Sequence, residues 1–160
     1  MAATPATKML DRAGVAYQLH AYDHDPRAEG YGLEAARLLG LDPARVFKTL
    51  IAQVEGRRPP SVVAVVPVMA KADLKALAAA AGGKRASLAA PANAARVTGY
   101  VVGGISPLGQ KRPLFTVVDR SALQWPTVFC SAGRRGLEVE VAPGELVALL
   151  GAVTAELQAR

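Results

Sequence analysis

The sequence predicts an α/β protein of the α+β type, with one domain over residues 1–160. Predicted strands and helices follow one another irregularly, which disfavours a doubly wound parallel sheet built from repeated β-α units. The apolar runs Val46–Val54 and Ser61–Val68 flank a polar turn that contains glycine and proline, as in an antiparallel hairpin. No repeat, low-complexity tract or linker divides the 160 residues, a length that can bury a hydrophobic core without disulfides.

The helices are predicted mainly from their boundary residues. Thr4 and Pro5 are typical of a helix start, and Gly14 ends the same helix. An alanine-rich helix over 72–81 stops at a pair of glycines. Further helices are predicted over 33–39, 91–97 and 145–150.

The strands are predicted from short apolar runs bounded by polar turns. Tyr17–Tyr22 ends in the polar turn Asp23–Pro26, and Tyr100–Val102 is a β-type run that leads into a glycine-rich loop. The other expected strands cover 46–54, 61–68, 114–118, 128–131 and 137–141.

The net charge points to an anionic partner. The chain carries a formal charge of +6. Composition alone leaves two interpretations open, a generically basic surface and nucleic-acid binding. Aromatic residues are 5% of the chain and are not interleaved with the basic ones, which argues against a broad platform for stacking bases. If RNA binds, we expect its end to be held through the backbone.

Targeting signals and cysteine usage predict a soluble, cytoplasmic protein. The N-terminus lacks the charged-then-apolar order of a signal peptide. The longest apolar run, Val62–Ala70, is too short to cross a bilayer, so no membrane partner is expected. Cys130 is the single cysteine, which excludes a disulfide framework and suits a reducing compartment.

The segment Thr98–Lys111 is the most informative part of the chain. It places Gly103, Gly104 and Gly109 around Pro107. Glycine permits positive φ and lets backbone N–H groups come close to a ligand, while proline stiffens the turn. Such a loop offers fixed donors to an anion or to a polarised carbonyl.

Two other interpretations of this loop fail. A phosphate-binding P-loop needs Lys-Ser or Lys-Thr after its last glycine, and Gln110 and Lys111 follow here. A serine-hydrolase nucleophile elbow needs glycine where Leu108 stands. Both histidines also precede Ser106, whereas that fold places its histidine after the serine.

Lys48 stands out because it lies on an apolar strand face. In a strand it shares its face with Val46, Leu50, Ala52 and Val54. A lysine in that position either extends to the solvent at the rim or meets an anion. Sequence alone leaves both interpretations open.

Neither a metal site nor a cysteine nucleophile is expected. His20 and His24 with two neighbouring aspartates resemble metal ligands, but residues four apart in a strand do not converge on one ion. Cys130 lies in an apolar strand pattern without an adjacent base, which is typical of a buried hydrophobic residue.

Four ordered blocks carry a resemblance to a known family. They are Tyr22–Asp25, Phe47–Leu50, the glycine-rich segment Gly99–Lys111 and Ser131–Leu137. Together they resemble the YbaK/EbsC-type editing domains associated with prolyl-tRNA synthetase, over the whole chain. The resemblance implies a mixed, largely antiparallel sheet that is curled into a partial barrel with helices around it.

The resemblance also implies the site residues. Lys48 corresponds to the functional lysine of the family, with an electrostatic role toward a phosphate oxygen or the ester carbonyl. Gly103 and Gly104 would provide the catalytic backbone. Tyr31 stands where many relatives have phenylalanine, and Glu138 stands where some have aspartate. The residues expected to bind substrate are Tyr22, Tyr31, Thr49, Ile105, Ser106, Pro107, Gly133 and Glu138.

The implied function is removal of a wrong amino acid from tRNA by a free-standing aminoacyl-tRNA deacylase, a hydrolase or lyase that needs no cofactor. The expected substrate is cysteine on the proline tRNA, with the substrate thiol attacking its own ester. Prolyl-tRNA synthetase is the implied protein partner, and DNA is not an expected one. Alternatives are deacylation of alanyl-tRNA for proline and a non-catalytic module that binds RNA or the synthetase.

Overall fold

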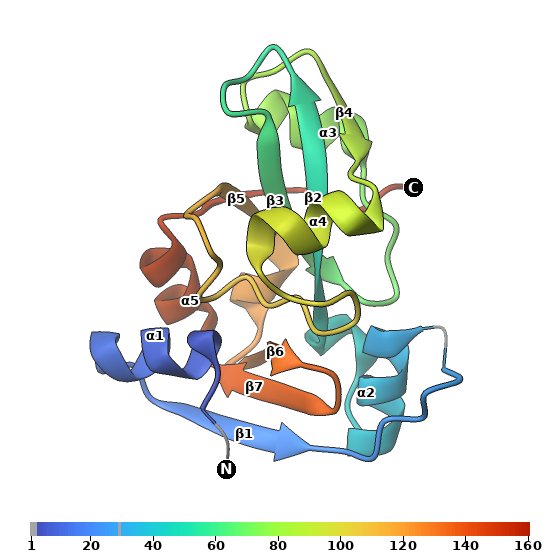
Figure 1. The fold of residues 1–160 in the computed structure, drawn as a ribbon, viewed down its shortest axis with the longest axis vertical. Helices are drawn as coiled ribbons and strands as arrows, with labels where there is room; N and C mark the ends of the chain where they lie inside the picture. Colours follow the sequence, from blue (N-terminus) through green and yellow to red (C-terminus); the bar gives the residue numbers. More distant parts are fainter. Residues whose placement is uncertain (1–2, 29) are drawn as a thin grey trace.

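A computed structural model describes residues 3–28 and 30–160, whose strands pair into two sheets. The smaller sheet is antiparallel, in the order β1 (Tyr17–Ala21), β7 (Leu137–Val141), β6 (Val128–Arg134). It lies with helix α1 (Pro5–Ala13) at one end of the molecule (Figure 1). An isolated bridge between Val46 and Phe129 connects its edge to the larger sheet.

The larger sheet is mixed and has the order β4-β2-β3-β5-β8. Strands β2 (Phe47–Glu55) and β3 (Ser61–Pro67) form an antiparallel hairpin, which β4 (Arg85–Leu88) extends on the β2 side. Parallel strands extend it on the other side; they are β5 (Phe115–Asp119) and β8 (Val153–Ala155). Strand β4 pairs with residues 52–55 alone, so the first half of β2 has a free edge.

Within the described residues, the helices lie around these two sheets. Helices α3 (Leu74–Ala80) and α4 (Pro91–Thr98) flank the hairpin, while α2 (Tyr31–Leu39) and α5 (Pro143–Leu150) lie on opposite sides of the molecule (Figure 1). Short 3-10 helices cover Pro43–Arg45 and Arg120–Gln124. None of these helices is long and apolar enough to span a membrane.

Strand β3 is buried on both faces, which explains its continuous apolar sequence. Val63 and Val65 face a core shared with the smaller sheet and with α1 and α5. Val62, Ala64 and Val66 face a second core against α3. Residues of one strand thus separate the two cores.

Strand β7 alternates between apolar and acidic residues, and the two kinds face opposite ways. Leu137, Val139 and Val141 are buried in the core shared with α1 and α5. Because side chains alternate along a strand, Glu138 and Glu140 share the opposite face. That face is the one that contributes to the site described below.

Most predicted elements are confirmed, with small shifts at their ends. The predicted strand over 100–102 is wrong, because Tyr100 is buried after the end of α4 and the next residues form a turn. The predicted start of the third helix at Ala72 is also too early, since Asp73 caps it by accepting from the Ala76 N–H. The sequence analysis missed the short strands β4 and β8.

The fold is α/β with two sheets, and the pairing is largely antiparallel. The resemblance implied one sheet curled into a partial barrel. Among the described residues, the strands pair into two sheets that the Val46–Phe129 bridge connects, and they form no closed barrel.

Candidate active site

A cavity of about 450 Å³ lies along the free edge of β2. It is bounded by the start of α2, the loop after α4 and the β6–β7 sheet face. Seven predicted site residues line it, namely Tyr22, Tyr31, Lys48, Thr49, Gly103, Ile105 and Glu138. Chain segments far apart in the sequence thus contribute to one cavity.

Lys48 contributes the only basic side chain among the residues that line the cavity. It is half-buried on β2, between Phe47, which enters the core, and Thr49. Burial lowers the pKa of its ammonium group, and no carboxylate among residues 3–28 and 30–160 offsets that effect. A desolvated cation without a counter-ion stabilises a negative oxygen that enters the cavity.

Thr49 also lines this cavity, and its hydroxyl is buried. Its Oγ1 has no hydrogen-bond partner within the described residues. A buried polar group without a partner costs free energy, about 1–3 kcal/mol for a neutral group.

Glu138 is the acidic residue of the cavity and is 6% exposed. Burial raises the pKa of its carboxyl to about 8. Nearby Tyr22 also has a raised pKa, because of burial first and the Glu138 charge second. The Tyr22 N–H donates to the Gly136 carbonyl at 3.0 Å, which fixes the end of β1 beside β7.

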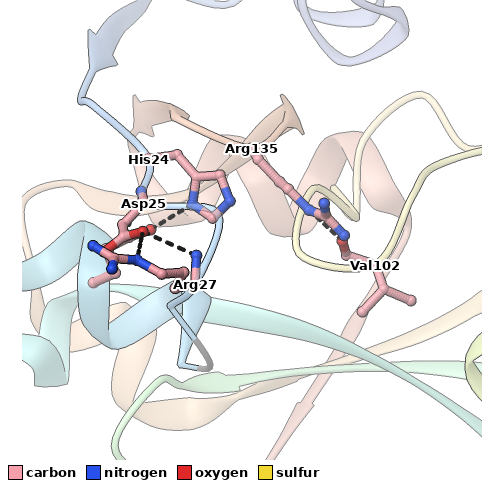
Figure 2. A network of polar contacts seen from close by, with 6 residues as sticks. His24, Asp25, Arg27, Val102 and Arg135 are labelled. Carbon is pink, nitrogen blue, oxygen red and sulfur yellow. Dashed lines mark hydrogen bonds and ion pairs between the residues drawn. The ribbon is translucent and has the colours of Figure 1, made fainter.

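Gly103 lies directly beneath two side chains from other parts of the chain. Its φ is +87°, and a Cβ there would lie 2.9 Å from the Tyr31 ring and from Arg135 Nε. Arg135 Nε donates to the Val102 carbonyl at 2.8 Å, and its guanidinium carbon lies 5.0 Å from the Tyr31 ring centroid. Figure 2 shows Arg135 reaching across to Val102.

The backbone of the glycine loop has both free and engaged donors. The Gly104 N–H donates to the Val101 carbonyl at 2.9 Å, so it closes a turn. The N–H groups of Gly103 and Ile105 donate no hydrogen bond within residues 3–28 and 30–160, and both residues line the cavity. Free donors at a cavity wall can stabilise a developing oxyanion.

Four predicted site residues lie behind the cavity wall rather than in it. Gly104 packs against the Arg134 backbone, and Gly133 lies under the Tyr100 ring. Ser106 is fully buried and its Oγ accepts from the Leu108 N–H at 3.2 Å. Pro107 is buried beside it. These residues hold the loop in place.

Comparison with known proteins identifies the family of the chain. The sequence profile of the aminoacyl-tRNA editing domain matches residues 28–149. The chain belongs to the aminoacyl-tRNA editing domain family. An Enterococcus faecalis protein named "Putative Cys-tRNA(Pro)/Cys-tRNA(Cys) deacylase EbsC" is 34% identical over 155 residues, which are 96% of this chain and 92% of that protein.

Solved structures share the fold of this editing domain. The crystal structure of hypothetical protein APE2540 has a TM-score of 0.84 and 27% identity, and the match covers 98% of this chain and all of that one. The crystal structure of a "putative trans-editing enzyme for prolyl tRNA synthetase" has a TM-score of 0.83 and 24% identity, over 99% and 100% of the two chains.

The editing domain also contains a polar network that the sequence analysis missed. His24 Nδ1 lies 2.7 Å from Glu34 Oε1, and the Asp25 N–H donates to Glu34 Oε2 at 2.9 Å. Burial alone would raise the pKa of Glu34, but these hydrogen bonds outweigh burial and lower it. The centroids of the His24 and Tyr31 rings lie 5.6 Å apart, so the network borders a residue of the cavity wall. A single glutamate in a helix gives no sequence signal for such a role.

The histidines and the cysteine of the editing domain are placed for structural roles. His20 Nε2 lies 2.8 Å from Glu140 Oε1. No group of three or more His, Cys, Asp or Glu side chains in the described ranges is arranged to hold a metal ion. Cys130 is fully buried, and burial raises the pKa of its thiol, which disfavours the nucleophilic thiolate.

Proposed function

We propose that this chain is a trans-acting deacylase that removes cysteine from the proline tRNA, and that residues 1–160 act as one editing domain. The observation that carries the proposal is the cavity in which Lys48 has no counter-ion beside the free N–H groups of Gly103 and Ile105. Membership of the editing family and the name of the E. faecalis relative support the substrate class.

The residues of the cavity supply electrostatic stabilisation and positioning. The ester carbonyl oxygen becomes negative during attack, and Lys48 with the two N–H groups is suited to bind it. An aminoacyl ester is already reactive, so positioning and oxyanion stabilisation account for rate acceleration without a protein nucleophile. Cys130 is buried, and in the part of the chain that the structure describes Ser106 forms no hydrogen bond to a histidine.

The attacking group is proposed to be the thiol of the substrate. Its sulfur bonds to the ester carbonyl carbon and forms a cyclic thioester, the bond from that carbon to the ribose oxygen breaks, and the thiol proton passes to that oxygen. Water then hydrolyses the thioester to free cysteine. Prolyl ester has no thiol and is spared, whereas a size filter gives only about 1–3 kcal/mol for one methylene.

The proposed partners follow from charge and family. A net charge of +6 suits binding of the tRNA acceptor end through phosphates. Prolyl-tRNA synthetase is the proposed source of tRNA selectivity, since few aromatic residues are present to read bases.

Single-turnover deacylation of five esters on one proline tRNA tests the proposal. We expect rapid release of cysteine and slow release of S-methylcysteine, serine, alanine and proline. Equal rates for the cysteinyl and S-methylcysteinyl esters would assign the attack to water. Preference for the alanyl ester would assign the enzyme to the alternative substrate, and no release from any ester would indicate a binding module.

A further inference from the structure

The cavity contains one basic and one acidic side chain that form no ion pair with each other in the described residues. Apart from two tyrosines, the titratable residues that line the cavity are the base Lys48 and the acid Glu138. The pKa of each is shifted by burial, and neither is shifted by the charge of the other. An acid and a base that line one cavity without pairing are each available to a different part of a ligand.

Glu138 differs from the other buried carboxylates that the structure describes. Glu34 accepts from His24 and the Asp25 N–H, and Asp119 accepts from Ser121, the Leu157 N–H and Gln158. The Glu138 carboxyl forms no hydrogen bond or ion pair within the described residues, and burial alone raises its pKa. A buried acid without a partner that faces a cavity is a binding group for a cation.

Glu140 provides an internal comparison on the same strand face. It lies two residues along β7, and it contacts His20 at 2.8 Å, Thr127 at 2.5 Å and Arg45 at 3.7 Å. These contacts satisfy Glu140 within the fold. The same face therefore carries one acid that is engaged in the structure and one that is free.

The neighbours of Glu138 do not provide a protein cation. Across the sheet it pairs with His20 of β1 and Ser131 of β6, and the His20 ring is turned to Glu140. Tyr22 lies close enough to be affected by its charge. The missing cation is thus expected to come from the ligand.

We propose that Glu138 binds the α-ammonium group of the aminoacyl ester while Lys48 faces the ester or its phosphate. This inference rests on the proposed function, since an aminoacyl ester is the ligand considered. The α-amino group, in its protonated form, is the cation that every aminoacyl ester offers next to the reacting carbonyl. Binding it draws Glu138 into its ionised form.

A contact to the ammonium group has a consequence for selectivity. An N-acylated ester, such as the peptidyl ester of a tRNA in translation, has no positive charge on its nitrogen and carries extra bulk. Glu138 would remain without a partner against such an ester. The pocket would thereby accept free aminoacyl esters and reject peptidyl esters, whatever their side chain.

Matched esters and matched variants test the inference. The esters are cysteinyl and 3-mercaptopropionyl on the same proline tRNA, which differ by the α-ammonium group and keep the thiol. The proteins are wild type, Glu138→Gln and the control Glu140→Gln, each checked for folding by circular dichroism. Single-turnover rates are measured for all six combinations with protein in excess of the ester but below saturation.

We expect wild type to lose about 10- to 100-fold when the ammonium is absent, the usual range for a hydrogen bond to a charged group. Glu138→Gln should lose a similar factor on the cysteinyl ester and show little further loss on the 3-mercaptopropionyl ester. Glu140→Gln should keep the wild-type ratio between the two esters. A Glu138→Gln protein that still discriminates by the wild-type factor would overturn the inference.

A binding measurement separates failure of this inference from failure of the proposed function. The probes are 3′-amide analogues of cysteinyl adenosine with and without the α-amino group, measured by calorimetry. If no ester is hydrolysed but the ammonium-bearing amide binds more tightly to wild type than to Glu138→Gln, the deacylase assignment fails and the Glu138 contact stands. Equal binding of the two amides to wild type would overturn the contact.

Discussion

Lys48 shows at the residue scale how burial changes the properties of a proposed catalytic side chain. It is half-buried, and burial lowers its pKa because no anion compensates. The sequence analysis left two interpretations of this lysine open, extension to solvent and contact with an anion. Its place in the cavity wall without a protein counter-ion favours the second.

We expect Lys48→Ala to reduce single-turnover deacylation by two to three decades, because loss of one preorganised group at a developing charge costs about 3 kcal/mol. The change should leave thermal stability near that of wild type. Exposed Lys75 on α3 provides the control, and Lys75→Ala should deacylate at the wild-type rate. Near-normal turnover by folded Lys48→Ala would remove this residue from the mechanism.

The two acids of β7 predict opposite effects of pH on stability. The folded pKa of Glu138 is raised from 4.5 to about 8, so between these values the unfolded chain is ionised while the folded protein keeps its proton. Stability therefore falls as pH rises through this window. Glu138→Gln removes that fall, and its advantage over wild type should grow between pH 4.5 and 8 to about 1–3 kcal/mol.

Glu140→Gln should behave in the opposite way. The hydrogen bond from Thr127 lowers the pKa of Glu140, despite burial, with His20 and Arg45 adding to the effect. Its ionised form thus stabilises the fold above the unfolded pKa, and this contribution is lost as pH falls through the folded pKa. Urea unfolding of both variants from pH 4 to 9 measures these trends. A constant stability difference between wild type and Glu138→Gln across this range would contradict the unusual ionisation.

At the scale of elements, tight packing explains the glycines in the loop after α4. The positions that a Cβ would occupy at Gly103 are already taken by the Tyr31 ring and by Arg135. Sequence reasoning attributed this glycine to close approach of a ligand. The structure adds an approach of α2 and the β6–β7 hairpin, which a local pattern does not reveal.

Gly103→Ala should lower deacylation by at least tenfold, because its methyl group displaces Tyr31 and Arg135 from the cavity wall. Gly151→Ala is the control, since Gly151 also has positive φ, +58°, but has nothing within 4 Å of its Cβ position. Both variants should lose about 1 kcal/mol of stability from backbone strain. Activity measured at a temperature where both are folded isolates the packing effect, and equal activity of the two variants would show that the loop is only a turn.

At the scale of the whole molecule, the net charge governs association with RNA. Phosphate contacts release counter-ions, so the logarithm of affinity falls linearly with the logarithm of salt concentration. With a charge of +6 and few aromatic residues, this chain is suited to phosphate contacts more than to base readout.

We expect weak binding of the isolated protein to uncharged tRNA, with a marked loss of affinity between 50 and 200 mM salt. Proline tRNA and an unrelated tRNA should differ by less than tenfold. Fluorescence anisotropy titrations at several salt concentrations measure both quantities. Tight, salt-insensitive binding of proline tRNA alone would show that this chain reads bases.

The sequence by itself determined the order of most helices and strands, because caps, glycine stops and alternating apolar residues act over a few neighbours. Thr4 and Gly14 cap the two ends of α1. In β7, apolar and acidic residues alternate, which separates a buried face from an acidic one. Four ordered motifs also placed the chain in its family before the fold was known. The missed strands β4 and β8 are short and depend on pairing with distant strands.

Only the tertiary structure decided which polar residues are satisfied and which are free. Glu138 and Glu140 look alike in sequence, yet His20, Thr127 and Arg45 converge on Glu140 and leave Glu138 to the cavity. The burial of an acid and its hydrogen-bond partners depend on residues that lie far away in the sequence, such as His20 and Glu140, which are 120 positions apart. A pattern of neighbouring residues carries no information about such contacts, and the charge state of the site is therefore a property of the folded chain.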